Sequence, residues 1–238
     1  MTALVDPAQM RLFRACFVAL VATSFVFGVR ASSIGQLGNE LNLSQTEVGT
    51  ILGVGLWPFA LSIVLFSLII DRIGYKVAAG CAFTCHIIAL IVTLAEPSYN
   101  TLFWGTFIMS IGNGIVEAFI NPVVATAFNT QKAKWLNILH AGWPLGLALG
   151  ALFATAINGL GLGWQAQYAV CFLPILAYGA MIIPCHFPPN ERAAAGISYK
   201  EMLGQVGAIG FFIIGGFATL AVMQLYVILS GTNIEPFQ

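Results

Sequence analysis

The residues of this chain that could carry chemistry are the ionisable side chains inside long apolar stretches. Glu117 lies within such a stretch, from Leu102 to Phe128. A charged side chain at the centre of a bilayer costs roughly 2.5–3.5 kcal/mol on insertion scales unless it is paired or faces water, so such residues are by default functional. Glu117 is therefore a candidate for binding and releasing a proton.

Arg30 is the second charge inside an apolar stretch. At about 1.5 Å of rise per helical residue, it lies roughly 10 to 15 Å from Glu117 along the membrane normal, which disfavours a direct ion pair. Alternatives to a proton-binding role for Glu117 are neutralisation by Arg30 and a hydrogen bond to a neighbouring helix. Arg30 itself is a candidate for binding an anionic group of a solute, or for reaching the lipid headgroups with its long side chain.

Polar and aromatic residues accompany Glu117. Pro122 cannot donate a hydrogen bond to the carbonyl of Ala118, so the sequence predicts that the helix breaks after Asn121 and helps to shape a cavity. His140 is a candidate for bonding a solute or relaying a proton, although a lone histidine is more often a packing residue. The flat side chains that could line a solute site, or else belong to the core, are Trp57, Trp143 and Phe119.

The sequence gives little support to an enzyme, a metal site or a nucleic-acid partner. It has no G-x-x-x-x-G-K-[ST] loop for an ATP-driven pump and no nucleophile–base–acid set. Cys81 and Cys85 lie one helical turn apart, and His86 follows Cys85 directly. A soft metal needs a fourth ligand, which the sequence does not place nearby, so we interpret the cysteines as packing residues. No cofactor is expected, and a net charge of zero gives no sign of nucleic-acid binding.

The elements that hold these residues are predicted to be membrane-spanning helices. Charged residues make up 8% of the chain, apolar residues 59%, and the mean hydropathy is +0.90. A spanning helix needs about 20 apolar residues, and the apolar runs do not alternate as barrel strands would. We therefore predict an all-α membrane protein. Its spans cover residues 12–37, 48–70, 77–95, 102–128, 136–160, 168–184 and 206–229.

The predicted second and fifth spans carry packing signals. In the fifth, Gly142, Gly146 and Gly150 recur every four residues and are continued by Ala154. One face of this helix is nearly bare of side chains, so another helix is expected to pack closely there. The pairs Trp57–Pro58 and Trp143–Pro144 predict kinks, or simple packing irregularities, in the two spans.

The positive charges predict the direction of the chain in the membrane. All Lys and Arg residues except Arg30 precede the first span or follow the second, fourth or sixth: Arg11, Arg14, Arg72, Lys76, Lys132, Lys134, Arg192 and Lys200. Positive loops stay in the cytoplasm, so the N-terminus is predicted to be cytoplasmic, in a multi-pass protein of the plasma membrane. This direction disfavours seven-helix receptors and retinal proteins, whose N-termini face outward.

A charged, Pro-containing segment divides the chain after the sixth span. We predict a six-span unit over residues 1–184, a cytoplasmic linker over 185–205 and the first span of a second unit over 206–238. Six spans, a linker and one more span make half of a twelve-span transporter plus one helix. The chain is therefore expected to stop partway through its fold, with a missing C-terminal half or self-association supplying the partner surface.

The turn after the second span resembles the signature loop of the major facilitator superfamily, G-x-L-x-D-R-x-G-R-K. The matching residues are Asp71, Arg72, Gly74 and Lys76, while Ser67 and Tyr75 replace a glycine and an arginine. In that family such a cluster latches the cytoplasmic gate. Taken alone, the residues indicate a positive turn in which Gly74 permits tight geometry.

A second stretch resembles the fucose permease-like branch of that superfamily, the sugar:proton symporters. Those proteins carry an acidic residue in the fourth span, four residues before an Asn-Pro pair, and a Leu-Asn pair opening the fifth span. Glu117, Asn121–Pro122 and Leu136–Asn137 match this pattern. The branch also has an acidic residue in the first span near the position of Arg30, and this departure puts the same coupling chemistry in doubt.

The resemblance implies a bundle of two inverted three-helix repeats, with a solute site near the bilayer midplane. It implies secondary transport, with proton-coupled uptake of a sugar or similar small polar solute by alternating access. The residues expected to serve it are Glu117, Asn121, Asn137, His140, Arg30, Trp143 and Trp57. The alternatives are efflux of hydrophobic compounds by the same fold, and a truncated membrane protein that transports nothing.

Overall fold

The structure is a computed structural model that describes residues 6–190 and 195–204, together with positions 207, 210, 215–216, 218–220, 222–223 and 225–226. Its described elements are all helical, and six of its helical segments are long and apolar enough to cross a membrane. The first six predicted spans are therefore confirmed. The predicted seventh span, over 206–229, falls largely outside the described residues.

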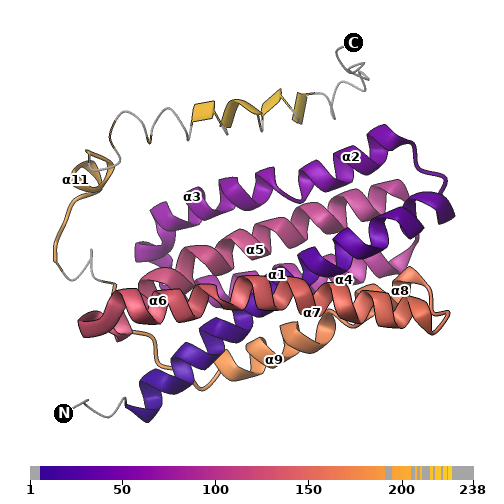
Figure 1. Cartoon of the computed structure of the whole chain (residues 1–238). Helices are drawn as coiled ribbons and strands as arrows, with labels where there is room; N and C mark the ends of the chain where they lie inside the picture. The colour runs from indigo at the N-terminus through magenta and orange to yellow at the C-terminus, as the bar shows by residue number, and fades with distance from the viewer. Residues whose placement is uncertain are drawn as a thin grey trace.

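The helices follow one another as an up-and-down bundle (Figure 1). In chain order they are α1 (Pro7–Glu40), α2 (Gln45–Val54), α3 (Trp57–Ile73), α4 (Tyr75–Ala95), α5 (Tyr99–Ala127), the 3-10 turn η1 (Asn129–Gln131), α6 (Lys132–His140), α7 (Gly142–Gly159), α8 (Trp164–Ala169), α9 (Phe172–Ile182) and α11 (Tyr199–Gly204). The second, fifth and sixth spans each consist of two consecutive helices. The interruptions of the second and fifth spans coincide with the kinks predicted at Trp57–Pro58 and Trp143–Pro144, whereas the interruption of the sixth span was not predicted.

Polar side chains start several of these helices. The carboxylate of Asp6 accepts a hydrogen bond from the backbone N–H of Ala8 at 3.0 Å, at the start of α1. At the start of α2, the Ser44 hydroxyl accepts from the N–H of Glu47 at 3.2 Å, and the Glu47 carboxylate accepts from the N–H of Ser44 at 2.8 Å. Such caps satisfy N–H groups that have no partner within the helix.

The prolines have different effects in different spans. Pro58 and Pro144 lie in the first turns of α3 and α7, directly after the interruptions, where a missing backbone N–H removes no helical bond. Pro122, in contrast, lies inside α5, which continues from Tyr99 to Ala127. The predicted break after Asn121 is therefore wrong. A membrane helix tolerates an internal proline because neighbouring groups can compensate for the lost bond.

The core of the bundle is built on α1 and α5. In the most apolar 18 residues of these helices, 72% and 67% of the residues are buried, against 28% in the second and fifth spans. Glycines let helices approach α5 from two sides. A Cβ added to Gly114 would overlap Ser62 on α3, and one added to Gly112 would approach the His86 ring on α4. His86 is itself buried, with its Nδ1 atom 2.8 Å from the hydroxyl of Tyr178 on α9.

The predicted glycine stripe packs against α1, which confirms the close helix contact expected there. Gly142, Gly146 and Gly150 are all buried, and so is Ala154 at the end of the stripe. A Cβ at Gly146 would overlap the Ser24 hydroxyl and the carbonyl of Val21, while one at Gly150 would overlap the carbonyl of Phe25. On the α1 side of this contact lies Gly28, where an added Cβ would overlap the carbonyl of Leu147 on α7. Two backbones therefore meet with almost no side chain between them.

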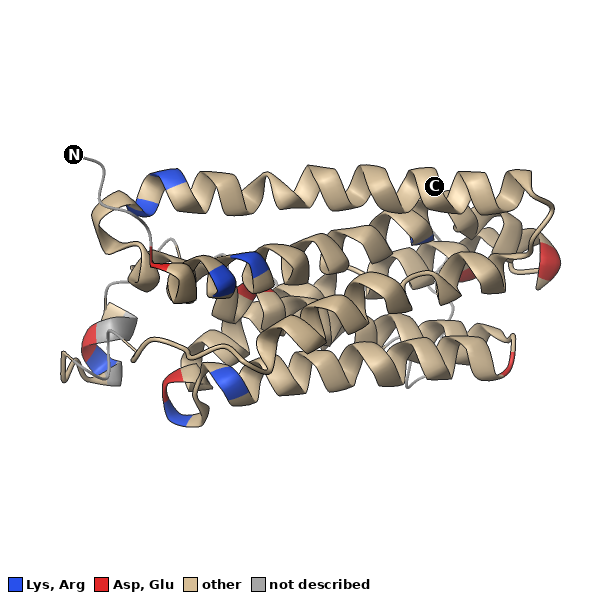
Figure 2. Cartoon of the chain, turned by 90° about the horizontal axis from the view of Figure 1, so that it is seen from below, with Lys and Arg blue, Asp and Glu red and all other residues tan. Residues whose placement is uncertain are grey.

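Charged residues gather at the ends of the bundle (Figure 2). We define the basic end by Arg11, Arg14, Arg72, Lys76, Lys132 and Lys134, and the acidic end by Glu40, Glu47 and Glu96. The helices lie between these ends, and their exposed surface is largely apolar, as expected for contact with lipid. That the basic end faces the cytoplasm stays a prediction.

Replacing Gly146 by Ala should destabilise the bundle, because the added methyl group overlaps the backbone of α1 and must push the two helices apart. We expect the free energy of unfolding to fall by about 1–3 kcal/mol, the usual cost of overpacking. Thermal unfolding of the purified protein in detergent measures this change. Gly159→Ala on the same helix is the matched control, because a Cβ there meets nothing within 4 Å. Equal midpoints for the two variants would contradict the close contact of α1 and α7.

Candidate functional site

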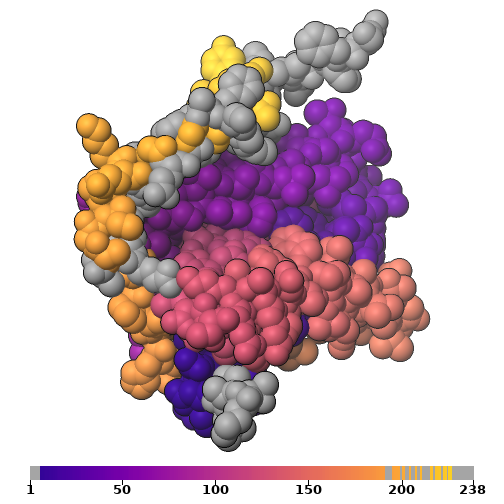
Figure 3. Space-filling model, turned by 60° about the vertical axis from the view of Figure 1, so that its left-hand side comes forward, coloured from indigo at the N-terminus to yellow at the C-terminus, as the bar shows by residue number. Residues whose placement is uncertain are grey.

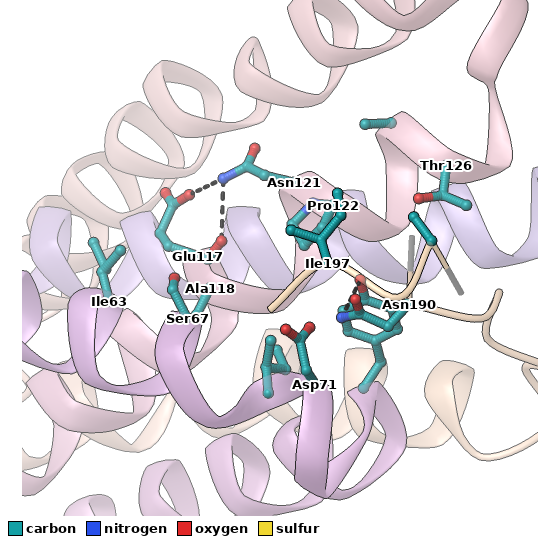
Figure 4. A pocket seen from close by; sticks show the side chains of 14 residues that line it. Ile63, Ser67, Asp71, Glu117, Ala118, Asn121, Pro122, Thr126, Asn190 and Ile197 are labelled. Carbon is teal, nitrogen blue, oxygen red and sulfur yellow. Dashed lines mark hydrogen bonds between the residues drawn. The ribbon is translucent and has the colours of Figure 1, made fainter. Parts of the chain in front are cut away.

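A cavity of about 680 Å³ lies between α3, α5 and the segment that follows α9. Its polar lining includes Glu117 and Asn121 from α5 and Asp71 and Ser67 from α3 (Figure 4). Ala195 and Ile197 close it on another side, and Figure 3 shows the orange segment that contains them along the edge of the purple α2–α3 surface. The cavity therefore joins the predicted proton-binding residue to the predicted gate motif.

Three of the predicted site residues form one chain of hydrogen bonds. The side-chain amide of Asn121 donates from Nδ2 to the Oε2 atom of Glu117 at 3.1 Å, and also lies 3.1 Å from the backbone carbonyl of Glu117. The Oδ1 atom of Asn121 is 2.9 Å from Nε2 of His140 on α6. Because a carbonyl oxygen only accepts, Nε2 of His140 must carry the hydrogen. The chain therefore runs from His140 through Asn121 to the carboxylate.

Glu117 lines the cavity, and no Lys or Arg side chain among the described residues forms an ion pair with it. Glu117 is half-buried, whereas His140 is exposed. Arg30 is only 4% exposed, and its guanidinium carbon lies 4.8 Å from the ring centre of Phe27. The hydrogen-bond partner of the Glu117 carboxylate, Asn121, lies on the same helix and not on a neighbouring one, and Arg30 lines a different cavity.

The predicted aromatic residues lie in different places. Trp143 of α7 belongs to a half-buried trio with Phe27 of α1 and Phe59 of α3, whose ring centres are 5.6–5.9 Å apart. Trp57 instead contacts Phe107 at 5.7 Å, and its buried Nε1 atom has no hydrogen-bond partner among the described residues. Phe119 is fully buried in the core, which agrees with the second of the two alternatives predicted for it. Its spacing alone did not distinguish a cavity face from a core face.

The residues of the gate motif form the tight turn between α3 and α4. Gly74 has φ +81°, a conformation that side chains with a Cβ rarely adopt. Asp71 points into the cavity, and Arg72 is exposed at the basic end. Lys76 donates from Nζ to the carbonyl of Ile183 at 3.4 Å, a tie to the end of the sixth span that the sequence did not predict.

The segment after α9 packs on the basic end of the bundle. Phe187 contacts the rings of Tyr75 and Phe119, with centres 6.3 Å apart in both cases. The amide of Asn190 donates to the hydroxyl of Tyr75 at 3.2 Å and also lines the cavity. No periodicity or motif marks Asn190 as a site residue, because an irregular segment carries no pattern that fixes its path. Its one sequence signal is its place in the predicted linker.

The other predicted residues are not brought into this group. Asn137 is exposed on α6, one turn before His140. Arg30 lines a separate small cavity inside the bundle. Within the described residues, no three His, Cys, Asp or Glu side chains are placed to hold a metal ion.

Comparison with known proteins gives a family match over most of the chain. The family model of the Major Facilitator Superfamily matches residues 16–236. Multidrug resistance protein D of Escherichia coli is 21% identical over 201 residues, which cover 81% of this chain and 50% of that protein. The gentisate transporter of Corynebacterium glutamicum is 23% identical over 174 residues, which cover 71% of this chain and 37% of that protein. The chain thus spans half or less of these relatives.

A solved structure of a bacterial homologue of the human drug peptide transporters has the same arrangement of helices. It superposes with a TM-score of 0.67 at 16% sequence identity, covering 94% of this chain and 54% of that one. At this identity the likeness concerns the fold alone.

The hydrogen-bond chain predicts energetic coupling between α5 and α6. Removing either side chain breaks the same bond, so His140→Ala and Asn121→Ala should be non-additive, with a coupling of about 0.5–3 kcal/mol. Thermal unfolding of the two single variants and the double variant measures this value. Asn137→Ala combined with Asn121→Ala is the control, because Asn137 is exposed on the same helix. If both pairs are additive, the bond between His140 and Asn121 does not form in the protein.

Proposed function

We propose, because the chain belongs to the major facilitator superfamily, that it is the N-terminal half of a proton-coupled secondary transporter for a small polar solute. Six apolar helices make it a multi-pass integral membrane protein. The matched residues cover 50% and 37% of the two relatives, so each relative has a long region that this chain does not match. The proposed transport unit therefore has a second bundle of helices, on the same chain or on a partner, that completes the solute pathway.

The observation that carries this proposal is the hydrogen-bonded carboxyl group on the wall of a cavity. Glu117 can gain or lose a proton there, and Asn121 holds it in a fixed direction. A carboxylate inside a membrane helix is costly and calls for a role. In the proposed cycle, Glu117 takes a proton from outside, the solute binds between the two halves, and rocking of the halves opens the site to the cytoplasm.

The proposed solute is a sugar or a compound of similar size and polarity. The pattern of Glu117, Asn121–Pro122 and Leu136–Asn137 supports this assignment through its resemblance to the fucose permease-like branch. The trio of Phe27, Phe59 and Trp143 supplies an apolar surface beside which a ring could lie. Asn137, exposed on α6, is a further proposed contact.

Export of hydrophobic compounds is the second candidate function. The similarity to multidrug resistance protein D of Escherichia coli favours it, as does the mainly apolar lining of the cavity. The similarity to a gentisate transporter adds an aromatic carboxylate to the solutes that deserve testing. If the protein moves no solute in transport assays, the remaining alternative is a membrane protein that associates with partners but does not transport.

The direction and the gate belong to the same proposal. We place the basic end in the cytoplasm and the protein in the plasma membrane, on the distribution of Lys and Arg over the ends of the bundle. Asp71 and Arg72 would then latch the cytoplasmic side of the pathway. The position of Asp71 supports this role, since it lines the cavity together with Glu117.

Replacing Glu117 by Gln should abolish uphill, uncoupler-sensitive accumulation of the solute, because the amide cannot carry a proton through the cycle. Exchange of solute across the membrane should persist in part, since the amide keeps the shape and hydrogen bonding of the site. Uptake and counterflow by cells that express the native protein measure the two activities. Glu96→Gln, at an exposed position between helices, is the control. Unchanged uncoupler-sensitive uptake in the Glu117 variant would overturn the role of this residue.

The two candidate functions predict opposite results in one counterflow panel. Vesicles that contain the native protein are loaded in turn with fucose, with gentisate or with a cationic dye. A sugar transporter should accelerate exchange of fucose at least several-fold over empty vesicles and leave the dye unaffected. Acceleration of the dye alone would identify an exporter, and acceleration of gentisate alone would change the solute class to aromatic acids.

A further inference from the structure

We propose that Arg30 forms a binding site for a monoatomic anion, of the chloride class, inside the six-helix bundle. This site is separate from the cavity that contains Glu117, and it does not depend on the proposed solute. It is lined by Arg30 of α1, Thr93 of α4, Thr106 of α5 and Tyr168 of α8.

The first observation is a buried guanidinium group with an unused donor. Arg30 is 4% exposed, and its Nη2 atom is fully buried with no hydrogen-bond partner among the described residues. Its guanidinium carbon lies over the face of the Phe27 ring, 4.8 Å from the ring centre. An arginine keeps its positive charge even when buried, so it cannot avoid the cost of burial by losing a proton. A buried charge of this kind requires a counter-ion.

The second observation is that the nearby ionisable side chains supply no such counter-ion. Those that act on Arg30 electrostatically are Tyr168 and Cys171, both of which are ordinarily neutral at pH 7. The carboxylates of the acidic end are either hydrogen-bonded to other groups or exposed. Glu47 accepts hydrogen bonds from Ser44 at 2.8 Å, and Glu40 and Glu96 are exposed at helix ends. The charge of Arg30 is therefore uncompensated within the described part of the chain.

The third observation is a small cavity beside the guanidinium that holds further donors. Its volume of about 10 Å³ admits one small occupant, a water molecule or a single ion in contact with its donors. A carboxylate or a sugar does not fit there. The guanidinium and the hydroxyl groups of Thr93 and Thr106 can donate hydrogen bonds, while the Tyr168 hydroxyl is hydrogen-bonded to Ser33. The remaining lining, which includes Leu90 and Met109, is apolar. Donors around a fixed positive charge select an anion and reject a cation.

The four polar residues come from four different helices, so a bound anion would tie α1, α4, α5 and α8 together. Arg30 also reaches the interruption of the second span, because a Cβ added to Gly55 would overlap its Nη1 atom. The carbonyl of Gly55 accepts a hydrogen bond from Ser110 of α5 at 3.0 Å. The anion site therefore adjoins the junction of α2 and α3, and its occupation should stabilise the whole bundle by mass action.

The test compares the thermal stability of the purified native protein in sodium chloride and in sodium gluconate at equal ionic strength. Gluconate is too large for the cavity, so we expect a higher midpoint of unfolding in chloride, rising with the logarithm of its concentration once this exceeds the dissociation constant. Arg30→Met should remove the difference between the two salts. Arg14→Met is the matched control, because Arg14 is exposed at the basic end of the same helix. Glu117→Gln should leave the chloride effect intact.

Two results would overturn the site. One is an equal midpoint in chloride and gluconate for the native protein, which would mean that the cavity holds water. The other is a chloride effect that persists in Arg30→Met, which would place the anion elsewhere. If Arg30→Met does not fold, Thr106→Val replaces it, and should raise the chloride concentration needed for a given shift of the unfolding midpoint several-fold. An unchanged chloride dependence in Thr106→Val would also reject the proposal.

Discussion

The contact between α1 and α7 is the constraint on which the rest of the structure depends. In a bilayer, helices gain nothing by hiding apolar surface from lipid, so they associate through close backbone packing. Gly28 on one helix and Gly146 and Gly150 on the other bring the two backbones together. This contact sets Phe27 beside Trp143, and it fixes the start of α7 and hence the end of α6, where His140 lies. The residues of the cavity are thus positioned by a helix contact made of glycines and backbone atoms, none of which takes part in binding or proton transfer.

The bundle keeps its two intramembrane charges apart. Glu117 lines a large cavity and accepts a hydrogen bond from the Asn121 amide. Arg30 is buried in the interior, over the Phe27 ring and beside the hydroxyl-bearing residues of its small cavity. If the two were paired, each would neutralise the other, and neither could respond to a proton or an ion. Their separation leaves each charge open to a mobile partner, which suits a protein proposed to couple the movement of small solutes to ion gradients.

The sequence predicted the spans well because their signal is strong and local. An apolar run of about 20 residues has few readings other than a membrane helix, and glycine at every fourth position directly indicates a close-packing face. It failed where the outcome depends on neighbours. The helix α5 continues through Pro122, and the sixth span is divided between α8 and α9. The meeting of Asp71, Glu117 and Asn190 in one cavity depends on the path of an irregular segment, which leaves no periodic trace in the sequence.

The hydrogen bonds from His140 through Asn121 to Glu117 have a direction, and that direction has a consequence. A charged carboxylate needs a donor, so the amide presents its NH₂ group to Glu117 and its oxygen to His140. Once Glu117 holds a proton and offers it to the same neighbour, the amide must turn over. Its NH₂ group then faces an imidazole nitrogen that carries a hydrogen, and His140 must move away or shift that hydrogen to its other nitrogen. If Glu117 binds a proton in this way, the event would be transmitted to a second helix by the rotation of a neutral group, with no charge moved between the helices.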